Sequence, residues 1–137
     1  MKYVKYALVA LLAVSFGVAA TPNDNSVDSV TKWEKAKQAY IHLLEHDNLG
    51  VKASAAGYIR KYNIVEATGA LKKVLECDNC ETVKFSAALA LVRIAGENGA
   101  TIVRNAMEIE QNELVVAFYE VVLHSESTQF IAPLTEN

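Results

Sequence analysis

Apolar residues recur at helical spacing along most of the chain, in segments separated by short polar turns. The first segment follows Thr31, and its apolar residues are spaced as on one face of an amphipathic helix: Trp33, Ala36, Tyr40, Leu43 and Leu44. The chain has only two prolines, Pro22 and Pro133, so no proline interrupts a helix between them. The pattern therefore predicts an all-α protein.

The predicted helices fall into three helix-turn-helix units. The first helix runs from Thr31 to a turn at residues 47–50. The other five are expected over residues 51–62, 64–76, 81–95, 100–110 and 113–124. Thr31 and Glu34 have the spacing of a capping box, in which a hydroxyl and a carboxylate satisfy free backbone N–H groups. Asn98 and Asn112 are expected to cap the helices of the third unit, and Gly96 is expected to end the helix before it in a left-handed conformation.

The units repeat one another in sequence. Residues 39–48 (AYIHLLEHDN) align with residues 70–79 (ALKKVLECDN) at a shift of 31, which pairs His46 with Cys77. Residues 51–59 (VKASAAGYI) align with residues 83–91 (VKFSAALAL) at a shift of 32, because the second turn is expected to hold one more residue. The third unit has larger residues in place of alanine, as expected of a terminal repeat that no neighbour covers: Phe118, Tyr119, Val121 and Val122.

The pattern V-K-x-S-A-A-x-x-[I/L] in residues 51–59 and 83–91 resembles the second helix of HEAT-like repeats. The resemblance covers about residues 39–124, although the third unit matches only at Val115 and Leu123. It implies a short right-handed α-solenoid of about three repeats whose second helices line the inner surface, which in this family usually binds other proteins. It implies no catalytic residues. The same segments supply small residues that let helices approach closely: Ala55, Ala56, Ala87 and Ala88.

Residues 1–20 have the features of a secretory signal peptide. Lys2 and Lys5 precede an apolar run, which ends in small residues with Val18 and Ala20 at positions −3 and −1 from a cleavage site. A retained membrane anchor is the alternative, but the run is shorter than the roughly 20 apolar residues that a membrane span needs. The sequence thus predicts an exported protein, periplasmic or secreted, that begins at Thr21 and is not stably inserted in a membrane.

These features divide the chain into a signal peptide (1–20), a flexible segment (21–30), a repeat domain (31–124) and a C-terminal tail (125–137). Without Lys2 and Lys5, 11 basic residues remain against 16 acidic ones, which gives a net charge of −5. Because acids and bases are interspersed, the charge argues against nucleic acid as a partner.

Cys77 and Cys80 are the only cysteines, and they flank a predicted turn. Since an exported protein meets oxidising conditions, a disulfide between them is the first expectation. A thioredoxin-like redox pair would need a strand before the motif, whereas here a helix ends at Cys77. Covalent haem attachment would need a histidine at residue 81, which is Glu81, and a structural zinc site would need two further ligands.

The segment from His42 to His46 matches H-x-x-E-H, the zinc-binding pattern of inverted metalloproteases, and Glu120 lies where a third ligand would be sought. Those enzymes are far larger, and the repeat pattern accounts for Glu45 without catalysis. We therefore expect exposed histidines, with His46 close to the C-terminal end of the helix dipole. The chain has no phosphate-binding loop and no nucleophile elbow, so we predict no enzymatic activity, metal or cofactor.

Most aromatic residues are expected to pack in the core or at its edges, because they follow the helical period. Phe85 is the exception, since it stands where Ala53 stands in the first unit. It belongs to a candidate partner-binding patch on the second helices: Lys52, Arg60, Lys84, Phe85 and Arg93. The sequence predicts a non-enzymatic interaction or scaffold module for an unidentified protein partner. The alternatives are a small thiol-redox or metal-handling protein centred on Cys77 and Cys80, and a structural protein of an envelope assembly.

Overall fold

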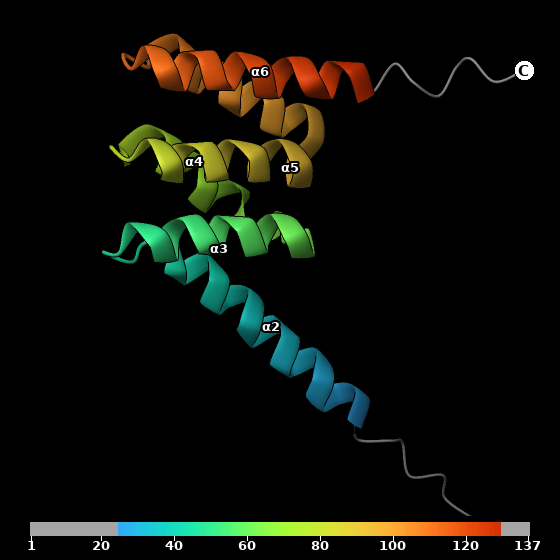
Figure 1. Ribbon diagram of the computed structural model, residues 1–137. Helices are drawn as coiled ribbons and strands as arrows, with labels where there is room; N and C mark the ends of the chain where they lie inside the picture. Colours follow the sequence, from blue (N-terminus) through green and yellow to red (C-terminus); the bar gives the residue numbers. More distant parts are fainter. Residues whose placement is uncertain (1–24, 130–137) are drawn as a thin grey trace, which may run out of the picture. The chain divides into compact units, whose positions relative to one another are not determined.

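The computed structural model describes residues 25–129, and this part of the chain is all-α, as predicted (Figure 1). Its elements are α2 (Asn25–Leu43), α3 (Leu49–Tyr62), the 3₁₀ turn η2 (Val65–Ala67), α4 (Thr68–Cys77), α5 (Glu81–Ile109) and α6 (Glu113–Gln129). None of these helices is both long enough and apolar enough to cross a membrane. The predicted signal peptide lies outside the described residues.

The described residues belong to two compact units, which divide between residues 32 and 33, within α2. In the first unit, residues 25–32 are helical, so most of the segment that was predicted to be flexible belongs to α2. Thr31 lies inside the helix, where its hydroxyl donates a hydrogen bond of 3.0 Å to the carbonyl oxygen of Asp28. The predicted capping box is therefore wrong, because residues 25–30 contain no proline or glycine that would stop the helix before Thr31.

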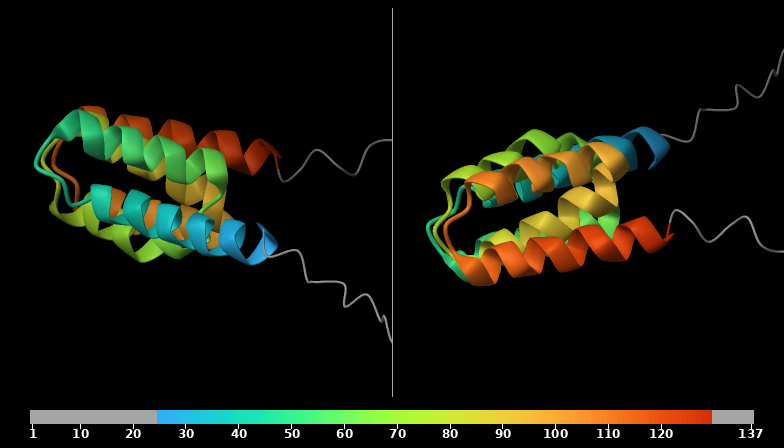
Figure 2. Two further views of the ribbon diagram at one scale, coloured as in Figure 1. Left: turned by 90° about the horizontal axis from the view of Figure 1, so that it is seen from below. Right: turned by 90° about the horizontal axis from the view of Figure 1, so that it is seen from above.

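In the second unit, the helices form three helix-turn-helix pairs. The first pair is α2, from Trp33, with α3; the second is α4 with residues 81–95 of α5; the third is residues 97–109 of α5 with α6. The first helices of the pairs lie in one layer and the second helices in another, as Figure 2 shows. α5 belongs to two pairs and packs against α3, α4 and α6, so it is the central element of this unit.

The core between the layers consists mainly of small and aliphatic side chains. The four alanines expected at close helix contacts are fully buried: Ala55, Ala56, Ala87 and Ala88. Among the larger residues of the third pair, Tyr119 and Val122 are buried, whereas Val121 is exposed. Glu120 is exposed although its repeat equivalents, Ala56 and Ala88, are buried. On that side of α6, no further helix of the described part of the chain covers the surface.

α5 bends sharply at Gly96, where φ is +53° and ψ is −127°. The positive φ was predicted, but the helix resumes at once instead of ending in a left-handed cap. Asn98 therefore lies inside α5, and its predicted capping role is wrong. Gly99 lies against the preceding half of the helix, because a Cβ added there would be 2.1 Å from the carbonyl oxygen of Leu91. The bend thus depends on two glycines. Gly96 adopts the positive φ, and Gly99 allows the two halves of the helix to approach closely.

The turn within each pair is built on a 32-residue period. Asn48 caps α3 by accepting a hydrogen bond of 3.1 Å from the N–H of Val51. Asn112 caps α6 in the predicted way, since its Oδ1 accepts a bond of 3.0 Å from the N–H of Leu114. Cys80 occupies the same position before α5, where its side chain makes no capping bond.

A second position in each turn accepts a backbone hydrogen bond two residues before the cap. His46 Nδ1 accepts from Asn48 N–H at 3.0 Å, and Asp78 Oδ1 accepts from Cys80 N–H at 2.9 Å. Glu110 Oε1 accepts from Asn112 N–H at 3.0 Å. The structural equivalent of His46 is therefore Asp78 and not Cys77, because the additional residue of the second turn precedes Asp78.

Other helix boundaries differ from the predicted ones by a few residues. α3 begins at Leu49, two residues early, because Asn48 is available as its cap. The predicted helix at residues 64–76 begins instead as the 3₁₀ turn and becomes α4 at Thr68. α6 continues to Gln129, so residues 125–129 of the predicted tail are helical. The remaining residues of the tail lie outside the described part.

Candidate functional site

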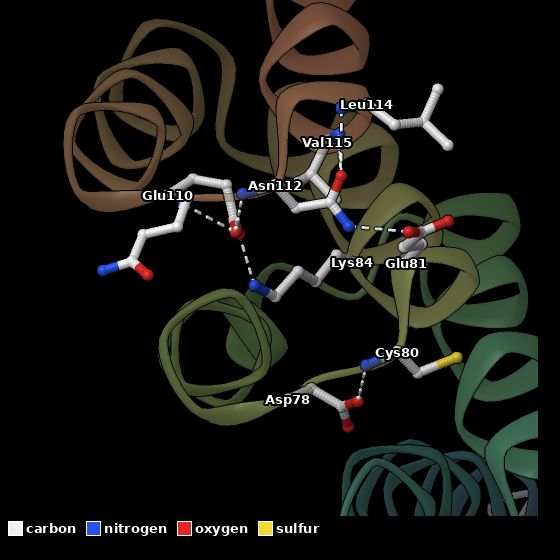
Figure 3. A network of polar contacts seen from close by, with 9 residues as sticks. Asp78, Cys80, Glu81, Lys84, Glu110, Asn112, Leu114 and Val115 are labelled. Carbon is white, nitrogen blue, oxygen red and sulfur yellow. Dashed lines mark hydrogen bonds and ion pairs between the residues drawn. The ribbon is translucent and has the colours of Figure 1, made fainter.

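The two lysines of the predicted partner-binding patch are held in contacts between neighbouring pairs. Lys52 Nζ on α3 lies 2.6 Å from Asp78 Oδ2, at the end of α4. Lys84 on α5 makes the equivalent contact with Glu110, at the end of the same helix after its bend (Figure 3). The side chains of Lys84 and Glu110 are only 13% and 10% exposed. Both lysines therefore hold successive pairs together in this structure.

The acids of these contacts are favoured in their charged form. Burial raises the pKa of Asp78, but the hydrogen bonds from Lys52 and from the N–H of Cys80 outweigh it and leave the pKa below its ordinary value. The hydrogen bond from Lys84 holds the pKa of Glu110 below its ordinary value, against the opposing effect of burial. Each carboxylate therefore accepts hydrogen bonds both from the backbone of its own turn and from a lysine of the preceding pair.

Asn112 connects the second and third pairs in a further way. Its Nδ2 donates a hydrogen bond of 2.6 Å to Glu81 Oε1 at the start of α5, and Figure 3 shows both side chains beside the Lys84 contact. A groove of about 550 Å³ lies along this junction and is lined by Glu81, Lys84, Glu110 and Asn112 among others. Within this groove Lys84 is paired with Glu110 and Asn112 with Glu81, and these two contacts join the second and third pairs.

Phe85 is engaged with the neighbouring helix. Its ring stacks on that of Phe118 in α6, with a centroid distance of 4.1 Å and an interplanar angle of 25°. Both side chains remain partly exposed. Arg60 and Arg93, the other members of the predicted patch, are exposed and have no carboxylate partner among the described residues.

The three second helices present a common face, which we call the second-helix face. Its positions recur every 32 residues: Ala53, Phe85 and Ala117; Ser54, Ser86 and Phe118; Gly57, Leu89 and Val121; Lys61 and Arg93. Figure 1 shows these helices side by side in one layer. Leu114 extends the apolar part of the face along α6, four residues before Phe118. Leu114 and Val121 are 57% and 65% exposed, so the face carries accessible apolar surface.

A second aromatic group lies on the first pair. The ring of Tyr40 stacks on those of Tyr58 and Tyr62 at centroid distances of 5.3 and 6.0 Å, and Trp33 meets Tyr62 edge to face at 5.6 Å. Packing was predicted for these residues and is confirmed, but Trp33, Tyr58 and Tyr62 are each about two-fifths exposed. Sequence reasoning missed this exposure. Their position in the repeat could have indicated the exposure. Tyr58 and Tyr62 belong to the first pair, whereas their equivalents in the second pair, Ala90 and Ile94, are buried.

The disulfide predicted between Cys77 and Cys80 is not formed in the structure, where both are free cysteines. Cys77 is exposed at the end of α4, and Cys80 is half-buried against the core. The two residues belong to different parts of the turn: Cys77 is the last residue of a helix, whereas Cys80 is the cap position of the next helix.

The histidines of the H-x-x-E-H segment do not converge. His42 is exposed, with its Nδ1 3.8 Å from Glu45 Oε2, while His46 lies beyond the end of α2 and accepts the turn hydrogen bond. His46 is therefore part of the turn instead of the helix end that was predicted. Within residues 25–129, no three histidine, cysteine, aspartate or glutamate side chains are grouped so that they could hold a metal ion.

Comparison of the chain with protein-family models, curated proteins and solved structures finds no match. Its function must therefore be inferred from its own residues.

Proposed function

We propose that this chain is a short right-handed solenoid of HEAT-like repeats and acts as a non-enzymatic protein-interaction or scaffold module, exported to the periplasm or secreted. The repeated turn positions and the two layers of helices support the architecture. The exposed apolar surface supports the binding role, because an exposed apolar patch on a protein often marks a site of contact with another protein.

The exposed apolar part of the second-helix face is the observation that carries this proposal. Phe85 and Phe118 form its centre, and Leu89, Leu114 and Val121 surround them. Stacked aromatic rings with surrounding aliphatic side chains resemble the core of protein interfaces, where a few such residues supply most of the binding energy. Of the predicted patch, Phe85, Arg60 and Arg93 remain candidates for partner contact, while Lys52 and Lys84 are assigned to the joints between pairs.

Site-specific crosslinking would test the proposal. A photoreactive residue introduced at position 89 should capture a recurrent partner in the compartment where the protein acts. Val121→Glu should abolish this capture, because it puts a charge into the exposed apolar part of the face. We call this part the apolar strip, and it consists of Phe85, Leu89, Leu114, Phe118 and Val121. The matched control is Ile109→Glu, which changes a residue that is 70% exposed in the other layer and should leave capture intact.

Two results would contradict the proposal. Capture that is equal in both glutamate variants would show that the second-helix face is not the binding surface. Capture that depends on Cys77 or Cys80, and survives Val121→Glu, would instead favour thiol chemistry as the function.

A further inference from the structure

We infer that the partner presents an amphipathic helix with an apolar stripe and carboxylates along one edge, which lies across the second helices. This inference rests on the proposed function and adds the chemistry of the partner. It follows from the distribution of charge along the second-helix face.

The basic edge of this face is regular. Lys61 follows Gly57 by four residues and Arg93 follows Leu89 by four residues, so each lies one helical turn further along the same side of its helix. Lys61 and Arg93 are repeat equivalents, 32 residues apart, and both are exposed. Arg93 therefore adjoins the apolar residue Leu89 on α5, whereas Lys61 adjoins the small residues of the face on α3.

The charge of this edge is not compensated within the described residues. The ion pairs of the described residues engage Lys37, Lys52, Lys72 and Lys84 with carboxylates, but neither Lys61 nor Arg93. Lys61 Nζ lies over the ring of Tyr62, 5.4 Å from its centroid. Two exposed cations without a carboxylate partner form a local positive edge, which is complementary to an acidic partner.

The spacing of the pairs sets the spacing of the partner's groups. Neighbouring packed helices lie about 8–10 Å apart, so Lys61 and Arg93 are separated by about one such step. A partner helix that runs across α3, α5 and α6 rises about 10 Å in seven residues. Carboxylates at i and i+7 would therefore meet Lys61 and Arg93, and apolar residues with the same spacing would meet the strip. The repeat position of Gly57 becomes apolar along this path, since it is occupied by Leu89 on α5 and by Val121 on α6.

A pair of synthetic helical peptides tests the inference. Both carry the same leucine stripe, and the flanking positions at i and i+7 are glutamate in one peptide and lysine in the other. Fluorescence anisotropy would measure the binding of each labelled peptide to the full chain at low salt. We expect the glutamate peptide to bind about tenfold more tightly, and we expect 0.5 M salt to reduce this preference.

Charge reversal locates the preference. Lys61→Glu combined with Arg93→Glu should remove or invert it. The matched control, Lys73→Glu with Arg104→Glu, makes the same change in net charge at two exposed residues of the other layer and should leave the preference intact. Because only exposed side chains are changed, both variants are expected to fold. Circular dichroism would check this.

The outcomes separate this inference from the proposed function. Equal binding of both peptides, lost in Val121→Glu, would overturn the acidic partner and retain the binding face. A preference that survives Lys61→Glu with Arg93→Glu would also overturn the inference. If neither peptide bound at millimolar concentration, that result would count against both proposals.

Discussion

At the scale of single residues, the contact between Lys84 and Glu110 offers a direct test of how the pairs are joined. Lys84→Met would leave the largely buried Glu110 without its cation. We expect a loss of about 2–3 kcal/mol in the free energy of unfolding, somewhat below the cost of breaking a fully buried pair. Urea denaturation would measure it. Lys72→Met is the matched control, because the Lys72 contact with Glu76 is exposed and should contribute less than about 0.5 kcal/mol.

The pH dependence of the same variant has a definite sign. Because the folded-state pKa of Glu110 is lowered, its contribution to stability is present above the ordinary value of 4.5 and is lost as pH falls through the folded-state pKa. The difference between wild type and Lys84→Met should therefore be constant near neutral pH and shrink below about pH 4.5. A difference that is unchanged at pH 3 would show that Lys84 acts through packing of its aliphatic stem instead.

Tyr119 is the one buried side chain of the described part whose polar atom lacks a hydrogen-bond partner. Its repeat equivalents are alanines, so the phenol is specific to the third pair. We expect Tyr119→Phe to stabilise the protein by about 1 kcal/mol, because it removes an unsatisfied hydroxyl and keeps the ring. Thermal unfolding would measure the effect, and Tyr58→Phe, at an exposed phenol, is the control with no expected change.

Alkaline pH should enlarge this gain. Burial, together with the nearby charge of Glu110, raises the pKa of Tyr119 well above the ordinary value of 10. The wild type therefore loses stability as pH rises above 10, since only the unfolded chain can ionise this phenol freely. If Tyr119→Phe were destabilising at every pH, the hydroxyl would have a favourable contact that outweighs its burial.

At the scale of the elements, the bend of α5 is the feature most sensitive to substitution. Gly99→Ala would bring a methyl group to 2.1 Å from a backbone oxygen of Leu91, so the two halves of the helix would have to move apart. We expect a loss of about 3 kcal/mol or more, at the upper end of what overpacking costs. Gly57→Ala is the matched control, because nothing lies within 4 Å of its added methyl. It should instead stabilise α3 by about 0.5–1 kcal/mol.

Chemical denaturation and hydrogen exchange would measure both glycine variants. Gly99→Ala should accelerate exchange in both halves of α5. A stability close to that of the wild type would mean that the halves of α5 separate easily and that Gly99 does not fix the bend.

The elements themselves could be predicted well because helical periodicity and the absence of internal proline are local signals. The second helices were recognised from residues 51–59 and 83–91, and Asn112 was recognised as a cap. The turn between α4 and α5 was misaligned, because Asp78 and Asn79 copy the Asp47-Asn48 dipeptide. In three dimensions, the cap of α5 is Cys80, which has no sequence signature of a cap. The bend at Gly96 could not be predicted in full from the local sequence. The need for a second glycine, Gly99, comes from its contact with Leu91 in the folded protein.

At the scale of the whole molecule, the candidate surface was predicted only in part. Phe85, Arg60 and Arg93 were chosen as exposed second-helix residues, and the structure leaves them at least partly accessible. Lys52 and Lys84 were chosen on the same grounds, but their partners lie 26 residues further along the chain. No local pattern marks such a pair. Leu89, Leu114 and Val121 were missed as surface residues, because an apolar position at helical spacing reads as core until the last pair is known to be uncovered.

The organisation around α5 gives an expectation for the folding of the second unit. One helix serves both the second and third pairs, and Lys84, Glu110, Glu81 and Asn112 join their turns. Repeat proteins unfold as coupled neighbours when the interfaces between repeats are strong. We therefore expect the second and third pairs to unfold together.

Val115→Ala tests this coupling, because Val115 is almost fully buried at the start of α6. Loss of its two methyl groups should cost about 2 kcal/mol. If the pairs are coupled, amide hydrogen exchange in the most protected parts of α6 and of both halves of α5 should accelerate by the same factor, on the order of 30-fold. Val65→Ala, at a side chain that is 51% exposed, should change none of them. Faster exchange confined to α6 would instead mean that the third pair opens alone. In that case, opening of the third pair would separate Phe118 from Phe85 and divide the apolar strip.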